Sequence, residues 1–280
     1  MGQTMKKRLY RLFQWLYKGV PVIQVTPSIS YLSDRKKLEG KRILIIGGTR
    51  GVGFQIAKKC QEYGAQVLIT GRQENTLQEA ASTLNNCPYL RFDVCDTDRL
   101  ENFIAQASTL LDGKVDSFVF NASLYLHEKS IAEVTPDGFD RQFATNVKAP
   151  YFLSKFFLDY LEKNQISPAN LLFISSEMGL YCNDVPYGLG KASLNSLVAG
   201  LSRRYLTKGI RINALAPGVL SNEASDVTQQ DLYRKYSCGQ RFIMPEEVAE
   251  VAAFILSDAA NCIAGAVIPC NQGNHYRCDW

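Results

Sequence analysis

The chain has 280 residues, of which 46% are hydrophobic and 21% charged, a composition that excludes a disordered chain, a collagen-like fibre and a coiled coil. Its formal net charge is +4, and five of its 31 basic residues fall, with no acid, between Met1 and Ser33. The rest of the chain has 26 basic and 27 acidic residues, so a nucleic-acid-binding role has no electrostatic support.

Residues 1–38 differ in character from the rest of the chain. Apolar residues recur there at helical spacing among basic ones, at Leu9, Leu12, Phe13, Leu16 and Val20. We therefore predict a basic amphipathic arm over 1–38, ahead of a separate domain over 39–280. Such an arm either docks weakly on a membrane surface or a partner protein, or packs on its own domain or a sister subunit.

From Lys41 onward, short apolar runs alternate with longer amphipathic stretches, which is typical of βα units and a parallel sheet. The apolar runs do not alternate with polar residues, as expected for strands covered on both faces. The predicted strands are 42–46, 66–70, 90–93, 117–120, 170–174, 211–215 and 266–269. The predicted helices are 53–63, 75–84, 98–111, 136–163, 187–208 and 245–256. We predict an α/β, doubly wound Rossmann-type fold: a single domain with a seven-stranded, mainly parallel sheet, helices on both faces and the N-terminal arm.

The eight cysteines are spread along the chain with no export signal ahead of them, which favours reduced thiols over a disulfide scaffold. No CxxC pair occurs, and His127 and His275 lie far apart, so we expect no metal site. No run reaches the roughly 18 apolar residues of a membrane span. The sequence therefore predicts a soluble, cytoplasmic protein.

A glycine-rich turn, Gly47-Gly48-Thr49-Arg50-Gly51-Val52-Gly53, follows the first predicted strand and leads into a helix. Backbone N–H groups and the helix dipole at such a turn attract a phosphate, and the missing side chains let it approach. The spacing is Gly-x-x-x-Gly-x-Gly rather than GxGxxG, and a simple tight turn is the alternative. The flanking strand and helix favour a dinucleotide site.

The second predicted strand ends at Thr70-Gly71-Arg72, where an acid would bind the ribose hydroxyls of NAD. A basic residue there accommodates the additional phosphate of NADP, and Arg50 offers a second cation. Each arginine alone is more often a solvated surface charge. Together they favour NADP(H).

Tyr187 and Lys191 lie four residues apart at the start of a helical stretch, so both side chains should share one face. A nearby ammonium would lower the high pKa of a phenol toward the range useful for proton transfer. Ser175 and Ser176 end the preceding strand, at the sheet edge where open α/β folds bind ligands. The combination indicates proton-transfer chemistry.

With these residues in place, the sequence resembles the short-chain dehydrogenase/reductase family in its compact one-domain branch, and within it the NADP-dependent carbonyl and oxoacyl reductases. The resemblance spans residues 38–280 and follows the family's order of motifs. Beyond the glycine loop these are Asp93-Val94, Asn121-Ala122, Asn146, Ser176, Tyr187, Lys191, Pro217-Gly218 and Pro245-Glu246-Glu247.

The resemblance implies four catalytic residues. Tyr187 would be the general acid or base, and Lys191 would lower its pKa and hold the nicotinamide ribose. Ser176 would hydrogen-bond the carbonyl oxygen, and Asn146 would position a proton-relaying water. The implied cofactor contacts are Gly47, Thr49, Arg50, Gly51, Val52, Gly53, Arg72, Asp93, Val94, Asn121, Ala122, Tyr187, Lys191, Pro217, Gly218 and Val219.

The chain also departs from the family's pattern. Ile46 replaces a threonine, Asn222 replaces another, and Phe120 and Ser123 replace the outer members of the Asn-Asn-Ala-Gly motif. The interval from Ser176 to Tyr187 is about two residues shorter than usual, which leaves Ser175 as the alternative serine.

We therefore predict an oxidoreductase that transfers a hydride between NADP(H) and a ketone or secondary alcohol, with residues 39–280 as its dinucleotide-binding catalytic domain. The alternative is a non-catalytic NADP-binding regulatory or scaffold protein of the same fold. The expected partners are a small carbonyl or alcohol substrate and further copies of the chain, because the family forms dimers or tetramers. Substrate identity and reaction direction stay open, since the presumed substrate lid, residues 219–241, has no decisive pattern.

Overall fold

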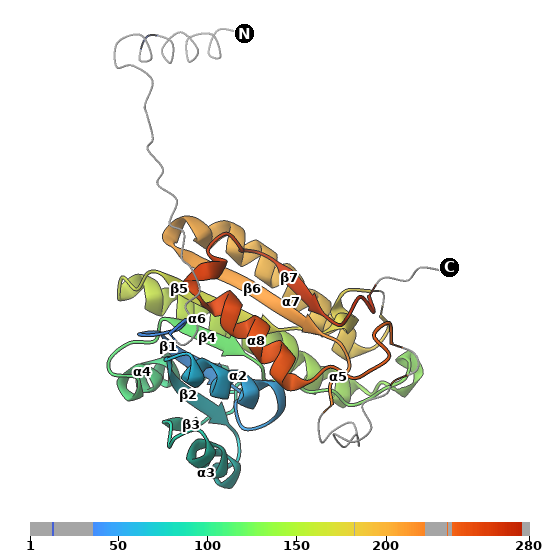
Figure 1. The fold of residues 1–280 in the computed structure, drawn as a ribbon. Helices are drawn as coiled ribbons and strands as arrows, with labels where there is room; N and C mark the ends of the chain where they lie inside the picture. Colours follow the sequence, from blue (N-terminus) through green and yellow to red (C-terminus); the bar gives the residue numbers. More distant parts are fainter. Residues whose placement is uncertain (1–12, 14–35, 182, 222–233, 235–236, 276–280) are drawn as a thin grey trace. The chain divides into compact units, whose positions relative to one another are not determined.

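The computed structural model describes residues 13, 36–181, 183–221, 234 and 237–275 (Figure 1). The chain divides into two compact units, residues 1–31 and 32–280. Of the predicted N-terminal arm, residues 1–38, the structure describes Phe13, which is helical, and residues 36–38, of which Leu38 is buried in the core. The arm as a unit and its boundary at residue 38 stay predictions. Among the described helices, none has the length and hydropathy needed to span a membrane.

A seven-stranded sheet forms the centre of the described unit, with the order β3-β2-β1-β4-β5-β6-β7 and every neighbouring pair parallel. This confirms the predicted doubly wound fold, because the strand order reverses beside β1, between β1 and β4. The strands are β1 Arg42–Ile46, β2 Gln66–Gly71, β3 Tyr89–Arg91, β4 Ser117–Phe120, β5 Ala169–Ile174, β6 Ile210–Pro217 and β7 Val267–Cys270.

Helices cover both faces of the sheet. One apolar cluster joins it to α2, α3 and α8, and a second joins it to α4, α6 and α7. In Figure 1, α2 and α8 run side by side over one face, and these two helices are in contact. The helices are α2 Gly51–Glu62, α3 Glu74–Thr83, α4 Leu100–Leu110, α5 Pro136–Phe143, α6 Ala149–Lys163, α7 Pro186–Tyr205 and α8 Pro245–Leu256.

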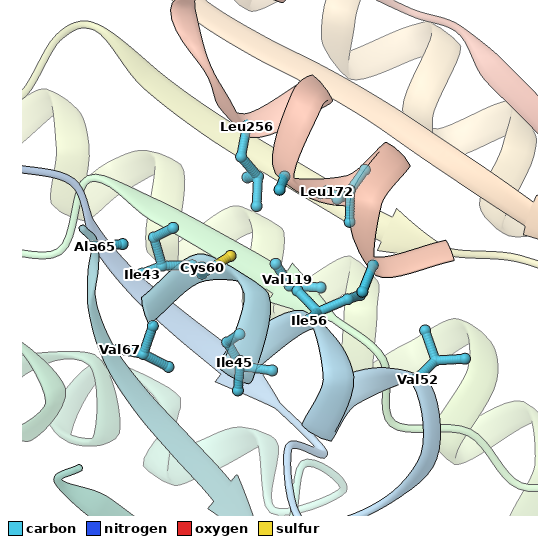
Figure 2. Close-up of a cluster of buried hydrophobic side chains, with 14 of the residues drawn as sticks. Ile43, Ile45, Val52, Ile56, Cys60, Ala65, Val67, Val119, Leu172 and Leu256 are labelled. Carbon is cyan, nitrogen blue, oxygen red and sulfur yellow. The ribbon is translucent and has the colours of Figure 1, made fainter. Parts of the chain in front are cut away.

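The continuous apolar strands supply side chains to both clusters. Along β1, Ile43 and Ile45 enter the cluster under α2, whereas Leu44 and Ile46 enter the opposite one. Figure 2 shows the first cluster, in which Ile43 and Ile45 lie beneath α2 and its Ile56. Strands without a polar face therefore follow from a sheet buried on both sides.

The long predicted helix over 136–163 is the main local difference. It begins as α5, where the Thr135 hydroxyl accepts a hydrogen bond from the Gly138 N–H (3.1 Å), and then passes through a π-helical turn, Ala144–Lys148, before α6. Single π turns inside helices recur at functional sites. This one contains Asn146, whose buried side chain is held by the loop after β4.

Smaller differences occur at element ends. The third strand is Tyr89–Arg91 rather than 90–93, and the helix predicted to reach Lys208 ends at Tyr205, followed by a 3-10 turn. Gly209, with φ of +74°, terminates that turn in a conformation that glycine adopts without strain.

The packing of the core lets us predict the effect of truncating Phe118. Its fully buried ring on β4 lies edge-on to the rings of Phe157 (4.9 Å between centroids) and Phe173 (5.4 Å). Phe118→Ala should lower the free energy of unfolding by about 3–5 kcal/mol through lost burial and the cavity left behind. Urea denaturation measures it, with Leu206→Ala, at a side chain 47% exposed, as the control expected within about 0.5 kcal/mol of the parent. Equal effects of the two changes would contradict this account of the core.

Candidate active site

Most of the predicted site residues follow the carboxyl ends of the parallel strands β1 to β6, at one edge of the sheet. Asn146 lies in the π turn before α6, and Tyr187 and Lys191 lie on α7. At the junction of β1 and β4, the N–H groups of Asn121 and Ala122 both donate to the Ile46 carbonyl (3.0 Å each). The Asn121 side-chain amide donates to the Gly47 carbonyl (2.8 Å). The glycine loop and the loop after β4 are therefore tied together.

The glycine loop has no room for side chains where it turns into α2. A Cβ on Gly53 would lie 2.1 Å from the Gly47 carbonyl oxygen, and Gly47 and Gly51 have φ of +78° and +56°. Within this fully described helix, the N-cap residue Arg50 makes no side-chain capping bond, and the first turn holds no acid. The free N–H groups and the positive end of the helix dipole suit a phosphate.

The two candidate phosphate-binding arginines lie at the ends of adjacent strands. Arg50 follows β1, Arg72 follows β2, and both are exposed. Within the described part of the chain, neither forms an ion pair with a carboxylate. Arg72 lies within electrostatic reach of Cys95, whose N–H is bound by the exposed Asp93 carboxylate (3.0 Å), while Val94 is buried in the core.

Tyr187 and Lys191 share one face of α7, as the spacing predicts. The Lys191 Nζ lies 5.5 Å from the centre of the Tyr187 ring and donates to the Ile174 carbonyl at the end of β5 (2.8 Å). The Lys191 side chain is 2% exposed, and this burial lowers the pKa of its ammonium to about 7.

The surroundings of the Tyr187 phenol differ from the expectation. The spacing argument predicts that Lys191 lowers the pKa of Tyr187, but burial raises it above its ordinary value, against lowering contributions from hydrogen bonding with Ser123 and Ser176. The Lys191 ammonium is bound to the Ile174 carbonyl instead of the phenol.

The two candidate serines have different partners. Ser176 caps a 3-10 turn by accepting the Met178 N–H (3.2 Å), and it lies at the phenol of Tyr187. Ser175 donates its hydroxyl proton to Asn195 on α7 (2.6 Å). The structure therefore brings Ser176, and not Ser175, to the phenol.

Asn146 is held in the π turn by the backbone after β4. Its side-chain oxygen accepts from the Leu124 N–H (2.9 Å) and the Ser123 hydroxyl (3.1 Å), and its amide nitrogen donates to the Leu124 carbonyl (2.7 Å). On the α7 side, Gly190 permits close packing, since a Cβ there would lie 3.2 Å from that of Asn146. The water-relay role implied for Asn146 stays a prediction.

The loop after β4 contributes residues that sequence reasoning did not assign to the site. The Tyr125 ring stacks on that of Tyr187 (4.4 Å between centroids) and lies tilted against that of His127 (4.2 Å). Ser123 contacts the phenol, and its only sequence signal was its departure from the family's glycine. Tyr125 and His127 had no signal, because no periodicity specifies an irregular loop.

A buried acid was also missed, beside the loop after β6. Glu177 is 5% exposed and accepts from the side-chain amides of Asn271 (3.1 Å) and Asn274 (3.0 Å). Gly218, whose N–H donates to the Cys270 carbonyl, lies so close that a Cβ on it would be 3.2 Å from the Glu177 carboxylate. The three predicted cofactor contacts Pro217, Gly218 and Val219 follow one another at the end of β6. The Val219 carbonyl accepts a hydrogen bond from the Ile243 N–H. Most of the predicted lid, including Asn222, lies outside the described residues.

Comparison with known proteins gives consistent matches. A family model described as enoyl-(acyl carrier protein) reductase matches residues 47–275. The 3-oxoacyl-[acyl-carrier-protein] reductase FabG of Rickettsia conorii is 30% identical over 84% of this chain and 97% of its own length. Human dehydrogenase/reductase SDR family member 4 is 27% identical over 89% of this chain and 92% of its own. The solved structure of ElxO with NADP bound has a TM-score of 0.76 and 27% identity, covering 84% of this chain and 98% of that one.

The buried Lys191 predicts a stability effect in the cofactor-free protein. Its ammonium keeps its proton in the unfolded chain up to about pH 10.4, whereas the folded protein holds it only below about pH 7, so the penalty on folding is full below pH 7 and fades as the pH rises toward 10. Lys191→Met should therefore raise the free energy of unfolding at pH 7 by roughly 2–4 kcal/mol.

Urea denaturation at pH 7 and pH 9.5 measures this, and the gain should shrink at the higher pH. Lys155→Met, at an exposed lysine on α6, is the matched control and should change stability by less than about 0.5 kcal/mol. A Lys191→Met protein no more stable than its parent at pH 7 would rule out a penalty from the buried ammonium.

Proposed function

The chain belongs to the short-chain dehydrogenase/reductase family, whose members are oxidoreductases that use a nicotinamide cofactor. We propose that this chain transfers a hydride between NADP(H) and a ketone or secondary alcohol. The observation that carries the proposal is the arrangement around Tyr187. Its phenol lies at Ser176, with Lys191 over its ring, at the carboxyl edge of the sheet. Proton donor, hydroxyl and ammonium are thus grouped where open α/β folds bind ligands.

The cofactor-binding part of the proposal is supported by the fit of the glycine loop to a dinucleotide phosphate. Because Gly53 has no side chain, it packs directly against the Gly47 carbonyl, and the first turn of α2 has N–H groups that no side chain caps. Arg50 and Arg72, at neighbouring strand ends, would hold the additional phosphate of NADP(H). The structurally similar ElxO has NADP bound, which favours the same choice.

In the proposed reaction, the bound nicotinamide supplies or accepts the hydride. During reduction, Tyr187 donates its proton to the substrate oxygen, and Ser176 hydrogen-bonds that oxygen as negative charge develops on it. Because burial raises its pKa, the Tyr187 phenol carries its proton at neutral pH, which suits donation. Lys191, anchored on the Ile174 carbonyl, would hold the nicotinamide ribose.

Self-association and a cytoplasmic location belong to the same proposal. Phe139 on α5, Tyr151 on α6 and Leu189 on α7 are 37%, 54% and 41% exposed, which supports pairing of subunits through these helices. The six described cysteines are free thiols, consistent with a reducing compartment.

The arginine pair predicts cofactor preference. Arg50→Ala and Arg72→Ala should each weaken NADPH binding by about 10- to 100-fold and leave NADH binding nearly unchanged, since only the additional phosphate loses a charge-assisted contact. Fluorescence titration measures both affinities. Arg141→Ala, at an exposed arginine of α5 paired with Asp137, is the control. Equal losses for NADH and NADPH would argue against this assignment.

The catalytic assignment predicts the effect of removing one oxygen atom. Tyr187→Phe should lower turnover by about 10²- to 10⁴-fold, the usual contribution of a general acid, while NADPH affinity stays close to that of the parent. The assay follows NADPH oxidation across ketones, aldehydes, keto-sugars, and oxoacyl and enoyl thioesters. Tyr205→Phe, at the far end of α7, is the control. Retained turnover in Tyr187→Phe would refute the mechanism, and NADPH binding without turnover of any compound would instead favour a non-catalytic protein.

A further inference from the structure

Ser123, the second residue after the Asn121 junction, connects two parts of the proposed active site. Its hydroxyl donates to the Asn146 side-chain oxygen in the π turn (3.1 Å). The same hydroxyl lies at the phenol of Tyr187, where its hydrogen bonding lowers the pKa of that phenol. A glycine at this position, as in the family's motif, would offer no such group.

The hydrogen bond from Ser123 to Asn146 is dispensable for Asn146 itself. The Asn146 oxygen also accepts from the Leu124 N–H (2.9 Å), and its amide nitrogen donates to the Leu124 carbonyl (2.7 Å). If the Ser123 proton turns away, the Asn146 oxygen keeps one donor and is not left unsatisfied. A serine hydroxyl rotates freely enough to make this exchange.

Apart from the two serines, the described groups around the Tyr187 phenol do not hydrogen-bond it in a way that would stabilise its ionised form. Tyr125, stacked on the ring from the loop after β4, raises the pKa of Tyr187, and its own phenol lies near Glu128. From α7, the Lys191 ammonium sits 5.5 Å from the ring centre and is bound to a backbone carbonyl. Among the described residues, hydrogen bonding from the two serines is what opposes the effect of burial on the phenol.

We propose that Ser123 is a positioning residue for Tyr187, whose hydroxyl points to Asn146 while the phenol is neutral and turns to the phenol oxygen when Tyr187 has given up its proton. This inference rests on the proposed function, in which Tyr187 is the proton donor. The proton transferred to the substrate is that of Tyr187, and the proton of Ser123 only changes its acceptor. Donation to an ionised oxygen is stronger than donation to a neutral amide, so the turn stabilises the phenolate.

Ser123 is well placed for a test by substitution. Its side chain is exposed in the structure, so neither loss of the hydroxyl nor one additional methyl group disturbs the core. Ser123→Ala removes the hydroxyl, and Ser123→Thr keeps it. Tyr125→Phe removes a neighbouring phenol that acts on Tyr187 in the opposite direction.

The experiment measures kcat/KM against pH for these variants with a ketone that the parent reduces. Reduction needs protonated Tyr187, so the limb that falls at high pH reports its pKa. Ser123→Ala should move this limb upward by about one pH unit, the shift expected from losing a charge-assisted hydrogen bond. Ser123→Thr should restore the parent profile, and Tyr125→Phe should not move the limb upward. An unmoved limb in Ser123→Ala, or the same shift in Ser123→Thr, would overturn the proposal.

A second measurement separates this inference from the proposed function. NMR of protein carrying isotope-labelled tyrosine, saturated with NADP⁺, follows the Tyr187 phenol through its titration without turnover, and Tyr187→Phe identifies its signal. If the parent turns over no substrate, the reaction assignment fails, but an upward shift of this titration in Ser123→Ala alone still supports the role of Ser123. A titration unchanged by Ser123→Ala would overturn that role even in an active enzyme.

Discussion

The backbone junction between β1 and β4 is the constraint on which the site depends. Two successive N–H groups, of Asn121 and Ala122, donate to the single Ile46 carbonyl, and the Asn121 amide binds the next carbonyl, of Gly47. These bonds fix the glycine loop against the loop that carries Ser123 and Tyr125. Because the strand order reverses at this junction, the chain leaves in opposite directions on either side, and the parts of the site that we propose to bind phosphate and to transfer a proton meet there.

At the same edge of the sheet, two ionisable side chains are buried at a cost to the charged form of each. Burial lowers the pKa of Lys191 and raises that of Tyr187, so both shifts favour the neutral side chain. A core position of this kind would be more stable with an apolar residue. Under the proposed function, keeping a lysine there exchanges stability for activity, as active sites commonly do. The Ile174 carbonyl, the last of β5, compensates part of the penalty by accepting a hydrogen bond from the Lys191 ammonium.

Much of this arrangement could be predicted from the sequence, because strands buried on both faces and glycines at a strand-to-helix turn are specified locally. The π turn at Asn146 could not, since the buried Asn146 side chain binds the backbone of Leu124, a contact between residues distant in the sequence. The choice of Ser176 over Ser175 depended on which hydroxyl Asn195 takes, a contact between separate elements. The net direction of the Tyr187 pKa shift could not be read from the spacing to Lys191, because spacing reports proximity and not burial.

The loop after β4 gives this chain its own chemistry within a shared scaffold. Helix α7 carries Tyr187 and Lys191, and the loop after β4 carries Ser123 and Tyr125, whose effects on the pKa of the Tyr187 phenol have opposite signs. Opposed contributions of this kind can be changed one at a time by substitutions in a surface loop, without disturbing the strands beneath. Under the proposed function, a serine in place of a glycine two residues beyond the junction would thus change the pH at which Tyr187 gives up its proton.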